Sequence, residues 1–180
     1  MGLSLRVVDT DALTRSDEQR LIALVARTFP GEKTLENKWH YDSRPDFVVL
    51  AEHESELVGV RIVVARDVIA DGRALRIAGL GIGVDPAHQR RGIGTALTKR
   101  ALDEVSARGF DLALAFLFTS NSERLLRAHG FAPLRARVSF VDRNGEVVVE
   151  TSPAFARALT HGAVDAIERA GALDLGVGTW

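Results

Sequence analysis

The sequence predicts a mixed α/β fold, in which about four helices flank a twisted, mostly antiparallel sheet of about seven strands with one parallel pair. Runs of apolar residues between turn signals predict the strands, and tight turns at Asp71-Gly72 and Asn144-Gly145 predict hairpins. A strand, a helix and a further strand over 80–118 predict the parallel pair. With 180 residues, a single domain over 1–180 is expected, with a core at about 3–150 and a C-terminal extension at 151–180.

The first half of the chain mixes strands and helices before a run of three antiparallel strands. Ser16-Asp17-Glu18-Gln19 predicts a capping box, with Ser16 as N-cap of a helix that ends at Phe29-Pro30-Gly31. Asp71-Gly72 turns the chain back toward residue 84. The expected elements here are a strand at 3–8, a helix that ends before Pro30, a short polar helix at 32–41, and strands at 47–51, 57–69 and 74–84.

The second half begins with an amphipathic helix at 92–108, which Gly109 is expected to end. The apolar run 112–118 predicts a strand buried on both faces. Beyond Pro153 the pattern weakens. The remaining expected elements are a helix from 121 or 122 to 129, a hairpin over 138–149, a short helix at 163–170 and an apolar tail at 171–180.

The composition argues against several classes of protein. The net charge of −1 provides no overall field for nucleic acid or for an acidic membrane surface. There are no cysteines for disulfides or thiolate metal ligands, and no other metal site is expected. Because no apolar run reaches the ~18 residues of a membrane span, a cytoplasmic protein without membrane partners is expected. The sequence leaves the oligomeric state open, and a homodimer is compatible with it.

One stretch carries the strongest functional signal. The glycine-punctuated strand at 80–84 ends at Asp85-Pro86, and the basic turn 89–94 leads into the next helix. The start of a helix offers free N–H groups and the positive end of the helix dipole, which suit an anion such as pyrophosphate. Gly92 and Gly94 allow close approach of the backbone, and two arginines add charged donors. The turn predicts a phosphate site, although an ordinary strand-to-helix loop is the alternative.

The run Gln89-Arg90-Arg91-Gly92-Ile93-Gly94 resembles the acyl-CoA pyrophosphate loop, Q/R-x-x-G-x-G/A, of the GCN5-related N-acetyltransferases (GNAT). The resemblance covers roughly residues 3–150 and implies the fold of that family. It also implies acetyl-CoA as co-substrate, whose acetyl group passes to a primary amine by direct attack in a ternary complex. The residues that it assigns to acetyl-CoA are Ile82, Gly83, Val84, Gln89, Arg90, Arg91, Gly92, Ile93, Gly94, Thr95 and Asn121.

The sequence departs from the family where the acid and base are often found. Leu126 stands at the position of a common tyrosine acid, and Leu80 at that of a common strand glutamate. Tyr41, the only tyrosine, is the candidate acid, with a packing role near Trp39 as its alternative. Glu32 is the candidate base, with a solvated helix-start charge as its alternative. A water chain and His129, at the end of the helix at 121–129, are other candidates for the base.

The apolar tail ends at Trp180, although chain ends are usually polar. It loosely resembles the branch with aminoglycoside N-acetyltransferases and nodulation-type acyltransferases, which implies that the Trp180 carboxylate lines an acceptor pocket. A tail tucked against the sheet is the equal alternative. The expected acceptor is a small amine, in one version polycationic and aminoglycoside-like. A catalytically silent acyl-CoA-binding module and a protein N-terminal or lysine acetyltransferase are the other hypotheses.

Overall fold

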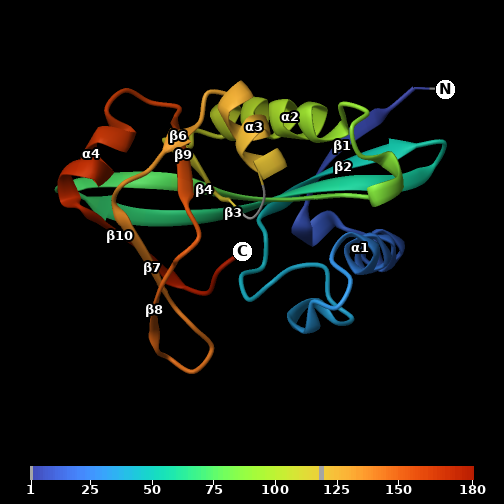
Figure 1. Ribbon diagram of the computed structural model, residues 1–180, viewed down its shortest axis with the longest axis horizontal. Coiled ribbons are helices and arrows are strands. Elements are labelled where there is room, and N and C mark those ends of the chain that lie inside the picture. The colour runs from blue at the N-terminus through green and yellow to red at the C-terminus, as the bar shows by residue number, and fades with distance from the viewer. Residues whose placement is uncertain (1, 118–119) are drawn as a thin grey trace.

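The computed structural model describes residues 2–117 and 120–180, without the side chains of residues 34, 120 and 121. Its centre is a seven-stranded sheet of order β1-β2-β3-β4-β5-β9-β6 (Figure 1). β4 and β5 run parallel, whereas the other neighbours in this sheet are antiparallel. The predicted fold class is therefore confirmed. The strands are β1 (Ser4–Asp9), β2 (Phe47–His53), β3 (Glu56–Ala70), β4 (Arg73–Val84), β5 (Leu112–Phe116), β6 (Ala132–Pro133) and β9 (Ala154–Ala158).

Helices cover both faces of this sheet. α2 (Ile93–Ala107) and α3 (Ser120–Ala128) lie on one face, and α1 (Arg15–Thr28) lies on the other (Figure 1). A second, three-stranded sheet shares the α1 side and consists of β10 (Ala172–Val177), β7 (Arg137–Val141) and β8 (Val147–Val149). α4 (Ala163–Ala170) precedes β10. No helix in the described part of the chain has the length and apolar composition of a membrane crossing.

Two apolar cores lie on the two faces of the central sheet because successive strand residues point in opposite directions. On β2, Val48 and Leu50 pack into the core between the sheet and α1. Phe47 and Val49 pack into the core between the sheet and α2. The apolar stripes of the helices complete each core. Fully buried members are Leu21 and Leu24 on α1 and Leu97, Ala101 and Val105 on α2.

The start of α1 differs from the prediction. Thr14, not Ser16, is the N-cap, and Asp17, not Gln19, completes the capping box. Asp17 accepts from the Thr14 N–H at 3.1 Å and from Arg6 on β1 at 2.5 Å. Although burial opposes the charge, these bonds lower the pKa of Asp17 to about 2. The Arg6 contact crosses between elements, and it explains why Asp17 is buried here.

The segment after α1 also differs. Only the short 3-10 turn η2 (Lys33–Leu35) forms where a helix over 32–41 was predicted. Asn37 takes a φ of 58°, in the left-handed region that ends a helical path. Leu35 and Trp39 are nevertheless buried in the core on the α1 side. Their spacing of four therefore reflects a folded loop and not a helix.

The C-terminal part holds the largest correction. The predicted hairpin forms as β7 and β8, but it lies in the small sheet. The place beside β5 is taken by β9, which the sequence did not indicate because its alanines have low strand propensity. The predicted tail helix forms as α4, and the tail itself forms β10. Residues after 150 thus supply strands to both sheets, so the expected boundary at 150 does not mark the edge of the core.

Candidate acyl-CoA site

The parallel strands β4 and β5 separate partway along their length. They pair only where Ile77, Ala78 and Gly79 face Leu112–Leu114. Residues 80–84 of β4 continue in register with β3 alone among the described residues. Because one antiparallel neighbour satisfies only alternate residues of a strand, the other N–H and C=O groups of 80–84 face the split. Ile82, Gly83 and Val84 therefore lie on an edge that an extended chain can join as an added strand.

The loop after β4 leads from this edge to the start of α2. The side-chain amide of Gln89 donates to the Val84 carbonyl oxygen at 3.1 Å. Arg90 takes a φ of 61°, and Gly92, the N-cap of α2, takes 79°. No side chain caps α2, so its first N–H groups lack intrahelical acceptors and point out of the helix. The loop therefore presents an uncapped helix start beside the open edge.

The charge and space around this helix start suit an anion. Arg90 and Arg91 are exposed and form no ion pair with any residue that the structure describes. A Cβ on Gly94 would meet Ile82 and Leu125 at an ordinary 3.6 Å, so packing alone does not require glycine there. Thr95 is exposed in the first turn, whereas Ile93 is buried in the core on the α2 side. Ile93 can therefore offer an anion only its backbone N–H.

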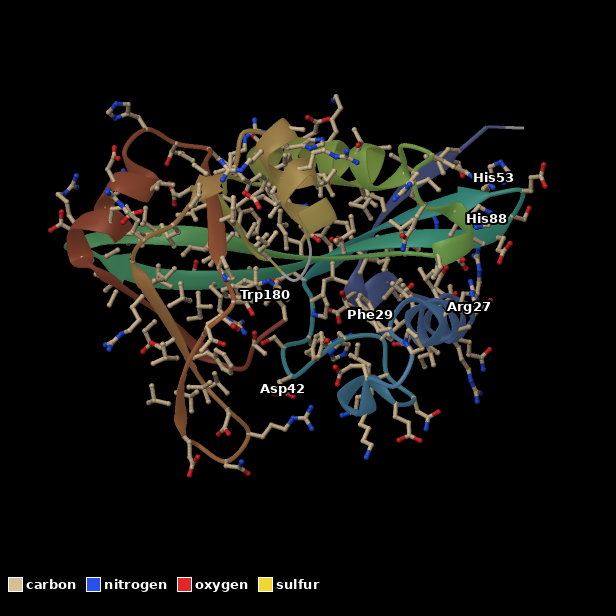
Figure 2. The ribbon with its side chains drawn as sticks, in the orientation of Figure 1. Arg27, Phe29, Asp42, His53, His88 and Trp180 are labelled. Carbon is tan, nitrogen blue, oxygen red and sulfur yellow. The ribbon has the colours of Figure 1, made fainter. Side chains whose placement is uncertain are left out.

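Asp85 fastens the loop to α1. Its carboxylate accepts from Arg27 at 2.7 Å and from the Ala87 N–H at 2.9 Å. The Arg27 bond is the main reason why the pKa of Asp85 is lowered. The side chain of His88 is 18% exposed, and its ring lies 5.9 Å from that of His53 (Figure 2). The loop is thus held by its contact with α1, while the start of α2 stays open.

A buried cation adds to the positive potential of the split. Arg61 lies on β3 in register with Ile82. It is 1% exposed, and its Nε and Nη2 have no hydrogen-bond partner among the described residues. Burial lowers its pKa to about 10, so the guanidinium still carries its charge at neutral pH. Such a charge in a low-dielectric setting favours negative charge on a neighbouring group.

Three glycines leave the α1 face of β4 without side chains. Gly79, Gly81 and Gly83 alternate along the strand and so share one face. A Cβ on Gly79 would lie 2.5 Å from the ring of Trp180, one on Gly81 would lie 2.7 Å from Ile62, and one on Gly83 would lie 3.5 Å from Phe29. Figure 2 shows Phe29 and Trp180 on this side of the sheet. Gly79 therefore makes room for the ring of Trp180 and Gly81 for Ile62, whereas packing alone does not require glycine at 83.

The tail is tied to the loop after α1 by Arg66 on β3. Arg66 donates to the Ser43 hydroxyl and to the carbonyls of Val177 and Gly178, and the Ser43 N–H donates to the Thr179 carbonyl. These segments border a pocket of about 590 Å³. Its lining residues are Lys38, His40, Tyr41, Asp42, Asp142, Arg143, Val177 and Gly178.

The structure brings the candidate acid and base into electrostatic reach of each other. Burial, and then the charge of Glu32, raise the pKa of Tyr41. Tyr41 packs partly against the core on the α1 side and also lines the pocket, so its packing role and an acid role are compatible. Glu32 is exposed just beyond α1. The ring of Trp180 is 5% exposed, which favours the tail tucked against the sheet.

Other residues singled out in the sequence lie away from the pocket. Leu80 and Leu126 are both buried in the core on the α2 side. His129 Nδ1 lies 2.9 Å from the Leu125 carbonyl oxygen and so is placed to donate to it. Asn121 belongs to α3, but its side chain is outside the described part of the chain. Its predicted contact with acetyl-CoA therefore stays a prediction.

Sequence reasoning missed Arg61, Arg66 and the role of Gly79. Arginines on an otherwise apolar strand were a usable signal, because a buried charge needs a reason. The alternating glycines of β4 were a second signal, since glycine within a strand often marks a close approach. The residues that fill the space above these glycines were not predictable, because they come from distant parts of the chain.

The fold defines this chain as an α/β domain in which an uncapped helix start lies beside a split parallel pair. The sequence model of the "Acetyltransferase (GNAT) domain" family matches residues 9–133. The chain belongs to this GNAT acetyltransferase family.

Known proteins resemble the chain at two levels. A mycothiol acetyltransferase of Beutenbergia cavernae is 43% identical over 61 residues, which are 33% of this chain and 20% of that protein. The chain thus spans about a fifth of that relative. The structure of YhbS from Escherichia coli in complex with CoA has a TM-score of 0.66 at 16% identity, covering 97% of this chain and 89% of that one. A phosphinothricin acetyltransferase from Sinorhizobium meliloti in complex with AcCoA has a TM-score of 0.61 at 18% identity, covering 91% of each chain. The two structures share the fold.

Proposed function

We propose that the protein is an acetyl-CoA-dependent N-acetyltransferase that acts on a primary amine of a small molecule. One observation carries the proposal: the open edge of β4 runs directly into the uncapped start of α2. This arrangement suits a ligand with a pyrophosphate at one end and an extended amide-bearing arm. The two fold neighbours, whose structures are complexes with CoA and AcCoA, support the same choice.

Each part of the site has a task in this proposal. Arg90, Arg91 and the first N–H groups of α2 bind the pyrophosphate, while Ile82–Val84 bind the arm through their backbone. Acetyl-CoA supplies an acyl group already activated as a thioester. A β4 N–H near Ile82 donates to the oxygen that becomes negative when the amine attacks. The buried charge of Arg61 favours the same negative charge.

Proton transfer is assigned to the α1 side. The amine is protonated at neutral pH and must lose a proton before it attacks, and the departing thiolate gains one. Tyr41, whose pKa is raised from the ordinary tyrosine value, keeps its proton at neutral pH and can donate it to the thiolate. The carboxylate of Glu32 is then the candidate base. The Trp180 carboxylate stays a candidate for binding a cationic acceptor.

The pocket favours a small acceptor over a strongly polycationic one. Two of its carboxylates are engaged: Asp42 pairs with Arg143, and Asp142 accepts N–H groups of its own turn. The names of the mycothiol and phosphinothricin enzymes also support a small-molecule acceptor. A single amine beside Glu32 and Tyr41 is therefore the proposed substrate. The cytoplasmic location expected from the sequence is part of this proposal.

An amine panel tests the proposal, with release of the CoA thiol as the readout. The panel combines small monoamines, aminoglycosides, and peptides with a free N-terminus or lysine. Turnover with a small amine supports the proposal, and turnover confined to peptides favours a protein acetyltransferase. If acetyl-CoA binds and no amine gives turnover, the chain is a silent acyl-CoA-binding module.

A further inference from the structure

Trp180 carries a hydrogen-bond donor that has no acceptor among the described residues. The residue is 5% exposed, and its indole Nε1 is buried without a partner. A buried N–H without an acceptor destabilises a fold, because the group has lost its bond to water. Such a group in a native protein therefore calls for an explanation, and a bound ligand is one.

The indole ring lies where β4 and β5 begin to separate. Its Cδ2, Cε2 and Cζ2 atoms would be 2.5–2.6 Å from a Cβ on Gly79, the last β4 residue that pairs with β5. The ring also stacks on Phe116, the last residue of β5, with ring centroids 5.3 Å apart and planes at 24°. Nε1 is bonded to Cε2, so it lies close to the closed end of the split.

We propose that the indole N–H of Trp180 donates a hydrogen bond to the carbonyl oxygen of the thioester of bound acetyl-CoA. The inference rests on the proposed function. When acetyl-CoA is held by its pyrophosphate at 89–94, its arm follows the open edge of β4 toward Gly79. The far end of the arm then lies where β4 and β5 begin to pair. That end carries the thioester.

The bond gives Trp180 a part in the reaction. The hydrogen bond strengthens as negative charge builds on the carbonyl oxygen, so the N–H supplements the β4 donor near Ile82. The indole keeps its proton throughout, and no bond to Trp180 forms or breaks. The rigid packing against Gly79 and Phe116 holds the donor in place before the ligand arrives.

Comparison of acetyl-CoA with CoA separates the thioester from the rest of the ligand. Both share the nucleotide, the pyrophosphate and the amide carbonyls of the arm, and only acetyl-CoA has the thioester carbonyl. Trp180→Phe removes the N–H but keeps an aromatic ring against Phe116. By titration calorimetry, the affinity of this variant for acetyl-CoA should fall about 3- to 10-fold, with little change for CoA. Trp39→Phe, at the only other tryptophan, is the matched control and should change neither affinity.

A measurement on the unaltered chain keeps the test valid if Trp180→Phe does not fold. The two indole N–H signals in a proton–nitrogen NMR spectrum are assigned with Trp39→Phe. Acetyl-CoA should move the Trp180 signal downfield, and CoA should leave it nearly unmoved. Equal responses to both ligands, or equal affinity losses in Trp180→Phe, would show a packing role and overturn the inference. If the unaltered chain binds neither ligand, the proposed function fails as well.

Discussion

The acyl-CoA side of the molecule is built mainly from one stretch, residues 80–97, whereas the acceptor side brings together four distant segments. On the first side, the backbone of β4, the turn and the first N–H groups of α2 follow one another along the chain. On the second, residues 38–43, Arg66, the turn at 142–143 and the tail at 177–180 meet only through tertiary contacts. The two sides share a border at Gly79, where the ring of Trp180 lies.

This difference relates to what each side has to recognise. Backbone N–H groups and strand edges are present in every sequence with this fold, so they suit a ligand common to a whole family. Side chains from separate loops can change independently, so they suit an acceptor that differs between relatives. Changes on the first side should therefore alter acetyl-CoA affinity, and changes on the second, apart from those at Trp180, should alter use of the amine.

The largest effect is expected from Arg91→Glu on the acyl-CoA side. It replaces an exposed, unpaired cation at the start of α2 with an anion. The affinity for acetyl-CoA should fall about 30-fold, on the order of 2 kcal/mol. Calorimetry measures the affinity, and thermal unfolding without ligand should be nearly unchanged. Arg15→Glu, at another exposed arginine, is the control, and an equal loss there would point to overall charge instead.

Asp85→Asn tests the contact that fastens the loop after β4 to α1. Losing the charged bond to Arg27 should lower the free energy of unfolding by about 2 kcal/mol near neutral pH. Because the pKa of Asp85 is lowered in the folded state, its stabilisation is present above the unfolded value of 3.8 and is lost as the pH falls through the lower folded value. The difference between the two proteins should shrink below about pH 4. Urea unfolding at several pH values measures this, with Asp103→Asn at an exposed pair as the control. A difference that does not depend on pH would exclude the charged bond as its cause.

Arg66→Met acts on the acceptor side alone. It removes the donors that hold Ser43 and the tail together, so we expect a loss of about 1 kcal/mol in unfolding free energy. The KM for the amine should rise while the affinity for CoA, which lacks the thioester that Trp180 is proposed to contact, stays within about twofold. Steady-state kinetics and calorimetry provide the two readouts, and Arg100→Met on α2 is the control. A parallel loss of CoA affinity would show that the two sides are not separable.

Gly94→Ala is expected to have the smallest effect on stability, and it should raise the free energy of unfolding instead of lowering it. The new Cβ meets only ordinary contacts, and alanine favours the helix, so unfolding free energy should rise by about 0.5 kcal/mol. Acetyl-CoA affinity should nevertheless fall, because the methyl group stands where a phosphate approaches the backbone. Thermal unfolding and calorimetry on one preparation test both changes. An unaltered affinity would remove Gly94 from the binding loop.

Features defined by neighbouring residues could be predicted from the sequence. The turn at 89–94, the helix after it and the hairpin at Asp71-Gly72 depend on residues close together in the chain. The parallel pair was predictable because a strand–helix–strand crossover leaves few alternatives. Local patterns failed where a distant partner decided the outcome. The Arg6 contact of Asp17 and the pairing of β9 with β5 are two examples.

The sequence by itself thus determined the fold class, the family resemblance and the predicted phosphate loop, because these depend on short-range backbone preferences and apolar patterns. Only the tertiary structure decided how far β4 and β5 stay paired, what fills the space above Gly79, and which loops border the pocket. These features arise from contacts between residues that are far apart in the chain, such as Ile77 with Leu112 and Gly79 with Trp180. Their packing depends on the shape of the whole core, which local patterns do not encode.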